Sequence, residues 1–389
     1  MDEESIVYTF FLIFAGSAIL ATVALYARQA LLVAYILLGA LLGPSGFALV
    51  KDPQLIQSIA NIGIIFLLFL LGLNLYPQKL LRLFRQALPI TLISALVFGL
   101  LGFGLTFSFG FGVVDALLVG VSCIFSSTIL GLKLLPTTIL HHRHAGEIII
   151  SILLLQDLLA ILVLSLLHAV EQGQLQLSGI LKLSIAFPLL LAIAYFGEKL
   201  LLQKLLRSFD RIHEYIFLLA IGWCLGIAEL ASVAGLSYEV GAFIAGVSLA
   251  NSPIARFIAE NLKPLRDFFL VMFFFALGAG FDFAAARTML VPTFILATML
   301  LVIKPVVFHT LLRRTHEAEQ FSWEIGFRLG QLSEFSLLLV FVAQHSGVLS
   351  NSAAYLIQSV TLLSFVVSSY LVVLRYPTPM AVTEALRRE

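Results

Sequence analysis

Charged residues are scarce in this sequence. Of its 389 residues only 12% are Asp, Glu, Lys or Arg, roughly half the share found in a typical soluble domain. Sixty percent are hydrophobic and the mean hydropathy is +1.06, so the chain has more apolar surface than one soluble core could bury. A soluble globular fold is therefore excluded, and the apolar side chains are expected to face lipid.

Signatures of other protein classes are also missing. The net charge is only +1 and gives no reason to expect nucleic acid as a partner. Cys123 and Cys224 lie inside apolar runs and imply no disulfide framework. The opening MDEES has no basic segment or cleavage site, so no signal peptide is expected. No nucleophile–base pair, metal-ligand cluster or phosphate loop is recognisable, so we expect neither an enzyme nor a bound cofactor.

Long apolar runs are abundant and have the length of transmembrane helices. A helix needs about 20 apolar residues to cross ~30 Å of hydrocarbon, and the alternating ~10-residue units of a β-barrel are not present. The sequence therefore predicts an all-α polytopic membrane protein with thirteen transmembrane helices. The expected spans cover residues 5–27, 30–47, 55–76, 87–110, 113–135, 146–170, 178–204, 211–234, 237–252, 262–282, 287–311, 321–347 and 351–375.

Lysine and arginine are distributed unevenly among the connecting loops. The chain has 23 of them, and Lys304 and Arg328 fall within spans. With the N-terminus outside, Lys51, Lys182 and Arg287 are external and the other 18 are cytoplasmic (23 − 2 − 3). Because positive residues favour the cytoplasmic side, we expect an inner (plasma) membrane protein with its N-terminus outside and its C-terminus inside.

The first polar interruption of an apolar span is Gln156-Asp157 in LLLQDLLAI, about halfway along 146–170. A carboxylate at this depth costs roughly 2.5–3.5 kcal/mol on insertion scales and marks a functional site by default. It can be neutralised by a proton or by a desolvated cation, but hardly by both at once, which is the chemical basis of antiport. Gln156 adds a neutral oxygen that suits a weakly hydrated monovalent cation. We predict an ion- and proton-binding site here; the alternative is a carboxyl group hydrogen-bonded only for packing.

The second interruption is Lys304-Pro305 in LVIKPVVFH. A lysine within a span either pairs with a carboxylate or extends its ammonium group to the interface. We expect Lys304 to be a charge partner of Asp157 or of carbonyl groups at the ends of half-helices. Extension toward the cytoplasmic interface is the alternative.

Two further polar clusters predict helices that unwind within the membrane. Span 5 and span 12 each carry side chains that can satisfy backbone groups freed by a break. Span 5 is the fifth of spans 1–6 and span 12 the fifth of spans 8–13, so the interruptions fall at corresponding places in two inverted six-helix repeats. The residues concerned are Ser126, Ser127 and Thr128 in span 5 and Gln331, Ser333 and Glu334 in span 12.

Seven segments spread over nearly the whole chain resemble the Kef-type branch of the monovalent cation:proton antiporter-2 family. Any one of them alone would be a weak signal, but they occur in register along the thirteen spans. The segments are GALLGPSGFALV at 39–50, NIGIIFLLFLLGLNL at 61–75, FSSTILGLKLL at 125–135, LLLQDLLAI at 153–161, GLSYEVGAFIAGVSLANSP at 235–253, FFFALGAGFDF at 273–283 and RLGQLSEFSLLLV at 328–340.

The resemblance implies a sodium/proton antiporter-like fold with crossed discontinuous helices, assembled as a homodimer in the lipid bilayer. It implies scaffold and dimer helices over 1–76 and 211–282, a linker helix over 178–204, and a mobile core over 87–170 and 287–375 that carries the ion across like an elevator. It also implies that K⁺, exchanged for H⁺, binds at Asp157 and Gln156. Lys304 matches the basic residue of the core, and Ser126, Ser127, Thr128 and Glu334 match the crossover motifs.

Two departures from the family pattern bear on mechanism and regulation. Ser333 stands where the family usually has glycine, which is expected to stiffen that break. Kef-type proteins usually continue into a cytosolic nucleotide-binding domain, and none is expected in this chain, so regulation is expected in a separate subunit, in a missing portion, or not at all.

Three other functions remain open at this point. The same scaffold could exchange Na⁺ for H⁺. A gated K⁺ efflux channel is disfavoured because no TVGYG-like filter is present. An organic-solute symporter is disfavoured by the narrow Gln156-Asp157 site.

Overall fold

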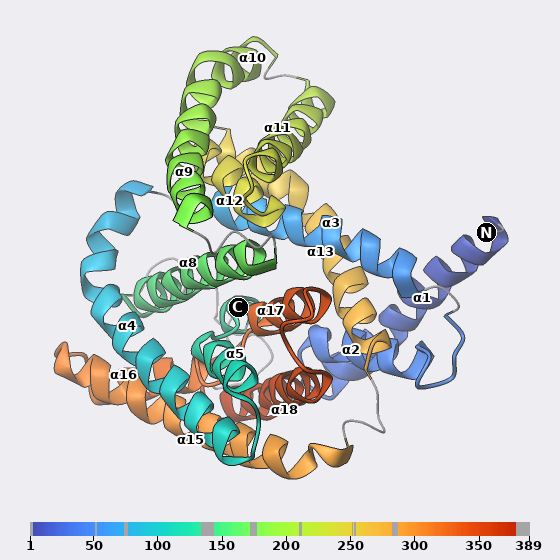
Figure 1. Ribbon diagram of the computed structural model, residues 1–389, viewed down its shortest axis with the longest axis vertical. Helices are drawn as coiled ribbons and strands as arrows, with labels where there is room; N and C mark the ends of the chain where they lie inside the picture. The colour runs from blue at the N-terminus through green and yellow to red at the C-terminus, as the bar shows by residue number, and fades with distance from the viewer. Residues whose placement is uncertain are drawn as a thin grey trace. The chain divides into compact units, whose positions relative to one another are not determined.

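The structure of the protein is a computed structural model (Figure 1), which describes residues 3–50, 53–73, 77–133, 144–171, 177–209, 212–250, 252, 254–281 and 287–378. Within these ranges the secondary structure is helical, with no β-strand. The prediction of an all-α protein is confirmed.

Seven of the described helices are long and apolar enough to cross a membrane by length and composition. Five shorter apolar helices lie among them, including Leu31–Leu42, Val113–Ile124 and Glu334–Gln344. The second expected span, 30–47, is shorter than predicted because α2 (Leu31–Leu42) ends at Leu42, Gly43 caps it, and the chain turns through Gly46. Hydropathy alone does not detect this turn, and the total of thirteen spans remains a prediction.

The chain divides into two compact units. The first comprises Met1–Leu49, Arg82–Ala160 and Gly278–Glu389, and the second Val50–Leu81 and Ile161–Leu277. Helices that lie wholly or largely in the first unit are α1 (Glu3–Tyr26), α2, α4 (Pro77–Ser108), α5 (Val113–Ile124), α6 (Thr128–Lys133), α8 (His144–Glu171), α15 (Leu290–Arg314), α16 (Glu319–Arg328), α17 (Glu334–His345) and α18 (Asn351–Arg375). Those of the second are α3 (Pro53–Leu73), α9 (Leu177–Gly197), η1 (Glu198–Leu202), α10 (Gln203–Ser208), α11 (His213–Val233), α12 (Tyr238–Leu249) and α13 (Ala255–Ala279).

An apolar core in the first unit joins α4, α8, α15 and α16. The rings of Phe98 on α4 and Phe308 on α15 meet edge to face with centroids 5.4 Å apart, and both side chains are fully buried. Ile152 of α8 and Ile325 of α16 complete the contact. This packing joins the four helices that carry or contact the polar residues described below.

The second unit packs its helices through small residues. A Cβ atom added at Gly246 on α12 would lie 2.0 Å from the carbonyl oxygen of Phe69 on α3. One added at Gly241, also on α12, would lie 2.6 Å from the Cα of Ala228 on α11. Such close backbone contact is typical of helix–helix interfaces in membranes. The hydrophobic effect does not drive helices together in lipid, and small residues let the backbones approach closely enough for favourable van der Waals packing.

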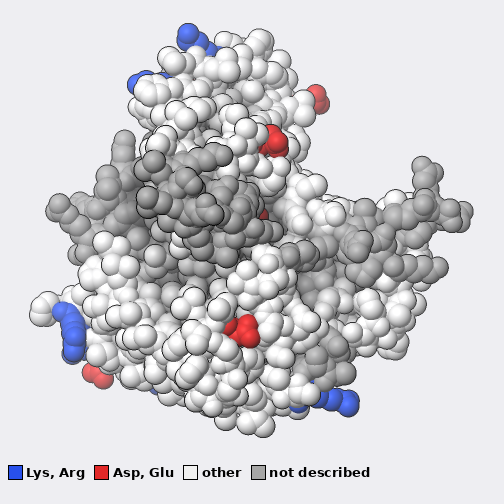
Figure 2. Space-filling view, viewed as in Figure 1, with Lys and Arg blue, Asp and Glu red and all other residues white. Residues whose placement is uncertain are grey.

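The described surface carries few charges. On the face shown in Figure 2 almost all described atoms belong to uncharged residues. Large apolar side chains such as Leu96, Leu189 and Leu218 are more than half exposed, at 64%, 57% and 66%. A lipid environment accounts for this exposure. The length and composition of the helices agree with the prediction of a multi-pass membrane protein.

Candidate functional site

The first broken helix consists of α5 and α6. Helix α5 ends at Ile124, residues 125–127 are not helical, and α6 begins at Thr128. Phe125 has extended dihedral angles, φ −80° and ψ 146°. The interruption therefore lies at the serine run that the sequence singled out.

Gln156 on α8 supports this break with both ends of its amide. Its Oε1 accepts a hydrogen bond from the backbone N–H of Ser126 at 3.0 Å, and its Nε2 donates to the carbonyl oxygen of Ile124 at 3.2 Å. The Gln156 side chain is completely buried. It thus replaces helical hydrogen bonds that the break removes, in a place where unpaired backbone groups would be costly.

Asp157 lies one residue further along α8 and is 2% exposed. Both of its carboxylate oxygens are within hydrogen-bond distance of the Thr128 hydroxyl, at 3.1 Å for Oδ1 and 3.0 Å for Oδ2. Ser127 uses its hydroxyl differently, because its Oγ accepts from the N–H of Leu130 and caps the start of α6. The structure therefore brings Gln156, Asp157, Ser126 and Thr128 together at one break.

The second broken helix consists of α16 and α17, which are separated by residues 329–333. Its support comes largely from hydroxyl groups of α18. The Oγ of Ser364 accepts from the N–H of Leu332 at 3.1 Å, and the Oγ of Ser368 donates to the side-chain oxygen of Gln331 at 3.0 Å. Ser333 caps α17 by accepting from the N–H of Phe335 at 3.1 Å. The two serines of α18 were not predicted.

Glu334 is the first residue of α17 and is 4% exposed. Its position at a helix N-terminus favours a negative charge. Among the described residues no three His, Cys, Asp or Glu side chains form a metal-binding cluster.

Lys304 of α15 contacts both breaks. Its Nζ donates to the carbonyl oxygens of Phe125 at 2.8 Å and Gln331 at 3.0 Å, and the side chain has no exposed surface. These partners are the half-helix carbonyls that were one of the two predicted alternatives. Within the described residues no ion pair joins Lys304 to Asp157, and the buried ammonium does not extend to an interface.

Direct contacts also join the two broken helices. The hydroxyl of Ser126 donates to the carbonyl oxygen of Leu329 at 2.8 Å, and that of Ser336 on α17 donates to the carbonyl oxygen of Ser122 on α5 at 2.7 Å. A further close approach brings α16 against α15, because a Cβ at Gly326 would lie 2.6 Å from the carbonyl oxygen of Pro305. The two broken helices and α15 therefore form one connected arrangement.

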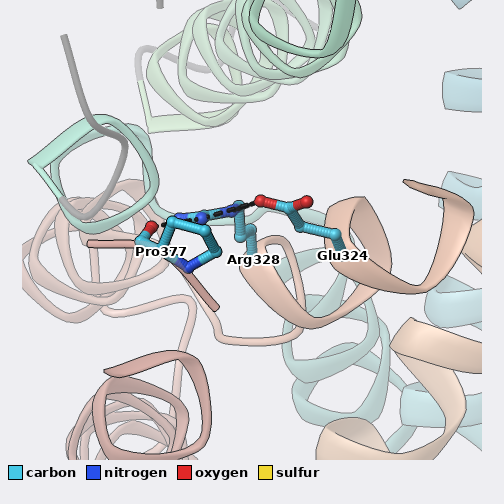
Figure 3. Close-up of polar contacts among 3 residues, drawn as sticks. All are labelled: Glu324, Arg328 and Pro377. Atoms are coloured by element: carbon cyan, nitrogen blue, oxygen red, sulfur yellow. Dashed lines mark hydrogen bonds and ion pairs between the residues drawn. The ribbon is translucent and has the colours of Figure 1, made fainter. Parts of the chain in front are cut away.

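Arg328, at the end of α16, is a buried charge for which the sequence analysis proposed no role. Its guanidinium pairs with Glu324 one helical turn earlier, at 2.8 Å, and donates to the carbonyl oxygen of Pro377 at 2.8 Å (Figure 3). The arginine side chain is 0% exposed and that of Glu324 is 23% exposed. The i, i+4 spacing of Glu324 and Arg328 is a signal that could have identified the pair, whereas the contact with Pro377 could not be read from the sequence.

A family model described as "Sodium/hydrogen exchanger, transmembrane" matches residues 11–373. The chain therefore belongs to this family of membrane transporters.

Three curated relatives are each 28% identical to the chain. They are the iron transporter MagA of Paramagnetospirillum magneticum, which matches 88% of this chain and 79% of its own length; the glutathione-regulated potassium-efflux system protein KefC of Enterobacter, 96% and 61%; and the K(+) efflux antiporter 4 of Arabidopsis thaliana, 89% and 60%. The resemblance to Kef-type antiporters is thereby confirmed. The chain spans about three-fifths of the length of these two potassium-efflux relatives.

The fold is shared with a solved structure, the sodium proton antiporter MjNhaP1 from Methanocaldococcus jannaschii. The TM-score is 0.72, and the match covers 95% of this chain and 97% of that one at 16% sequence identity. At this identity the likeness establishes the fold. A sodium/proton antiporter-like fold, expected from the sequence, is confirmed.

Proposed function

We propose that the protein is a secondary active transporter that exchanges a monovalent cation, K⁺, for H⁺, with Asp157 binding the two in alternation. The observation that carries the proposal is the buried carboxylate of Asp157 beside the break at 125–127. Its family, and relatives named as potassium-efflux proteins, agree with this activity.

The chemistry of exchange follows from the surroundings of Asp157. The carboxylate is removed from water and receives a hydrogen bond from Thr128. A buried carboxylate must be neutralised by a proton or by a cation, so binding of one disfavours the other. Thr128 can turn its hydroxyl oxygen toward a cation because that oxygen is both donor and acceptor. The site thus couples cation binding to proton release.

The preference for K⁺ is proposed to arise from neutral oxygens around Asp157. In this proposal Gln156, Ser126, Ser127 and Thr128 offer neutral oxygens that suit a weakly hydrated cation, and Thr128 is the one whose hydroxyl contacts the carboxylate. Because Oε1 of Gln156 already accepts from Ser126, its second lone pair is the one available for a cation. Gln156 therefore has two roles in the proposal, as a cation ligand and as the support of the break.

Transport is proposed to follow an elevator mechanism in a homodimer. The core helices over 87–170 and 287–375 would move against scaffold helices over 1–76 and 211–282, with 178–204 as linker. The two broken helices, with the crossing contacts from Ser126 and Ser336, support a pair of inverted repeats. Thirteen spans, an external N-terminus and a cytoplasmic C-terminus complete the proposed topology.

The test is a flux assay in proteoliposomes with a trapped pH-sensitive dye. We expect K⁺ and Rb⁺ gradients to drive proton movement more strongly than Na⁺ or Li⁺, and Asp157→Asn to abolish it. Asp267→Asn is the matched control, because this aspartate is exposed and pairs with Arg266. Full activity of Asp157→Asn would contradict the mechanism.

Exchange of Na⁺ for H⁺ is the second candidate. The description of the family and the fold shared with a sodium proton antiporter favour it. The same assay separates the two, since a stronger response to Na⁺ than to K⁺ would assign the protein to sodium exchange. Gln156→Asn should weaken the preference for K⁺ if this side chain sets selectivity; an unchanged cation profile would place selectivity elsewhere.

A further inference from the structure

A second buried carboxyl group, that of Glu198, lies in an apolar helix of the second compact unit, whereas Asp157 belongs to the first unit. Glu198 is 4% exposed and is part of the segment Ile185–Leu206, which is long and apolar enough to cross a membrane. It lies eight residues before the end of this segment (206 − 198), which is about 12 Å along a helix. An ionisable side chain at such a depth is costly in lipid and marks a functional site by default.

Glu198 is the first residue of the π-helical turn η1, which lies between α9 and α10. The backbone N–H of Gln203 donates to the carbonyl oxygen of Glu198, and the Nε2 of Gln203 donates to Oε1 of Glu198 at 3.0 Å. Both bonds have the i, i+5 spacing of a π-helix. In a regular α-helix the neighbours of Glu198 would be Leu201 and Leu202, which have no polar side-chain group. The bond between the two side chains therefore holds the π register.

A tryptophan of α11 lies against the start of this turn. A Cβ atom added at Gly197 would lie 2.8 Å from Cη2 of Trp223, so the indole packs directly on the backbone of the glycine. The Nε1 of Trp223 donates to Oγ of Ser248 on α12 at 3.1 Å, which fixes the ring. A change of helical register at Glu198 would therefore change the surroundings of this indole.

The groups around Glu198 favour its protonated form. In the part of the chain that the structure describes, no ion pair involves Glu198, and Gln203 is the one side chain that bonds to its carboxyl group. The neighbouring Lys199 is exposed, and its ammonium lies 5.7 Å from the centroid of the Tyr195 ring. A buried carboxylate without a counter-charge takes up a proton. The neutral acid can still accept the bond from Gln203.

Helices α11 and α12 pack against α9, and α10 follows η1 directly. Their described titratable side chains form no hydrogen bond or ion pair with Glu198. These side chains are those of Lys204 on α10, of His213, Glu214, Tyr215, Cys224 and Glu229 on α11, and of Tyr238 and Glu239 on α12.

We propose that Glu198 is a second proton-binding site within the membrane and that its proton holds the helix in the π register. When the proton passes to water, the carboxylate requires a hydration that Gln203 alone cannot replace. The bond to Gln203 then breaks, and the turn can return to the α-helical register. The residues after the turn rotate about the helix axis relative to those before it. This site goes beyond the proposed exchange, because it binds no cation.

The experiment uses Trp223 as a probe that the protein already contains. The chain has two tryptophans, so Trp323→Phe leaves Trp223 as the only one. Fluorescence of the purified protein is recorded across pH in choline chloride, without K⁺ or Na⁺. Glu198→Gln is the test variant, because glutamine has the shape of the neutral acid but cannot lose a proton. Glu214→Gln is the matched control, because Glu214 is exposed in the first turn of α11, the helix of the probe.

We expect the emission of Trp223 to follow a one-proton titration in the Trp323→Phe protein and in the Glu214→Gln control. Glu198→Gln should abolish this titration and retain the low-pH emission throughout. Gln203→Leu, which removes the hydrogen-bond donor and no ionisable group, should give the high-pH emission throughout. A titration that persists in Glu198→Gln, or the absence of any titration in the Trp323→Phe protein, would overturn the proposal. Equal emission of Glu198→Gln and Gln203→Leu would also overturn it.

Failure of Glu198→Gln to fold counts against the proposal as well, because the amide has the shape and neutrality of the form that is proposed to hold the helix. The proposed exchange mechanism has a separate readout. Loss of flux in Asp157→Asn tests that mechanism, and it can succeed or fail independently of the titration of Trp223.

Discussion

The break at 125–127 and the break at 329–333 both receive hydrogen bonds from a following long helix, but from different side chains. Helix α8 supports the first with the amide of Gln156 and places the carboxylate of Asp157 beside it. Helix α18 supports the second with the hydroxyls of Ser364 and Ser368. A hydroxyl network can stabilise a break, but it cannot exchange a cation for a proton near neutral pH.

The comparison indicates that the two breaks have different roles. The first break has Asp157 of the proposed exchange site beside it, whereas the second is followed by the buried carboxylate of Glu334 and provides the Gln331 carbonyl that accepts from Lys304. Substitutions at the first break should therefore alter both stability and ion exchange. Substitutions of the hydroxyl groups that support the second break should alter stability while leaving the cation preference unchanged.

The largest expected difference in the free energy of unfolding is between the Gln156→Leu variant at the first break and the Ser364→Ala variant at the second. The first leaves the buried N–H of Ser126 and the carbonyl of Ile124 without a partner, at about 1–3 kcal/mol each. The second leaves only the N–H of Leu332 unpaired. We expect an unfolding free energy lowered by about 4 kcal/mol against about 2 kcal/mol, measured by denaturant or thermal unfolding in detergent. Equal costs at the two breaks would contradict the comparison.

Substitutions in the Arg328–Glu324 pair, next to the second break, should have an intermediate effect on the free energy of unfolding. Glu324→Gln removes the negative charge that pairs with the fully buried guanidinium at 2.8 Å, and because Glu324 is itself partly exposed we expect a loss of about 2 kcal/mol. Arg328→Met removes the buried charge and retains apolar volume, so it should cost less, about 1 kcal/mol.

Denaturant or thermal unfolding of the two variants measures whether Glu324→Gln loses more stability than Arg328→Met. In the flux assay both variants should show an unchanged preference among K⁺, Na⁺ and Li⁺. A greater loss in Arg328→Met than in Glu324→Gln would show that the arginine stabilises α16 mainly by packing and by its bond to Pro377.

The smallest effect concerns Ser333, where the Kef-type pattern has glycine. Its φ of −117° is accessible to any residue, and its hydroxyl caps α17. Ser333→Gly should therefore change the unfolding free energy by only a few tenths of a kcal/mol, and Ser333→Ala should lower it by about 1 kcal/mol. If Ser333→Gly instead raised the rate of exchange several-fold in the flux assay, the serine would be shown to stiffen the break, as the sequence predicted.

Much of the first break could be predicted from the sequence, because its groups are costly in lipid. A carboxylate, an amide and a lysine stand out within apolar helices, and the structure gathers Gln156, Asp157, Ser126 and Thr128 at one place. The two carbonyl partners of Lys304 belong to the backbone, so no residue type identifies them in advance.

The support of the second break could not be predicted, because serine and threonine in an apolar helix have two uses. Thr361 and Ser369 bond to carbonyls of their own helix, whereas Ser364 and Ser368 on the same helix also reach the break. The sequence does not distinguish these cases. The ends of helices could not be predicted either. In α2, for example, the apolar run of the sequence continues past the turn at which the helix ends.

The central claim is that one carboxylate binds either a cation or a proton. The most direct measurement adds K⁺ to purified protein in a weakly buffered solution and records proton release together with bound K⁺. The wild type should release about one proton for each K⁺ bound, Asp267→Asn should behave in the same way, and Asp157→Asn should release none. Binding of K⁺ without proton release in the wild type, or unchanged release in Asp157→Asn, would contradict the account.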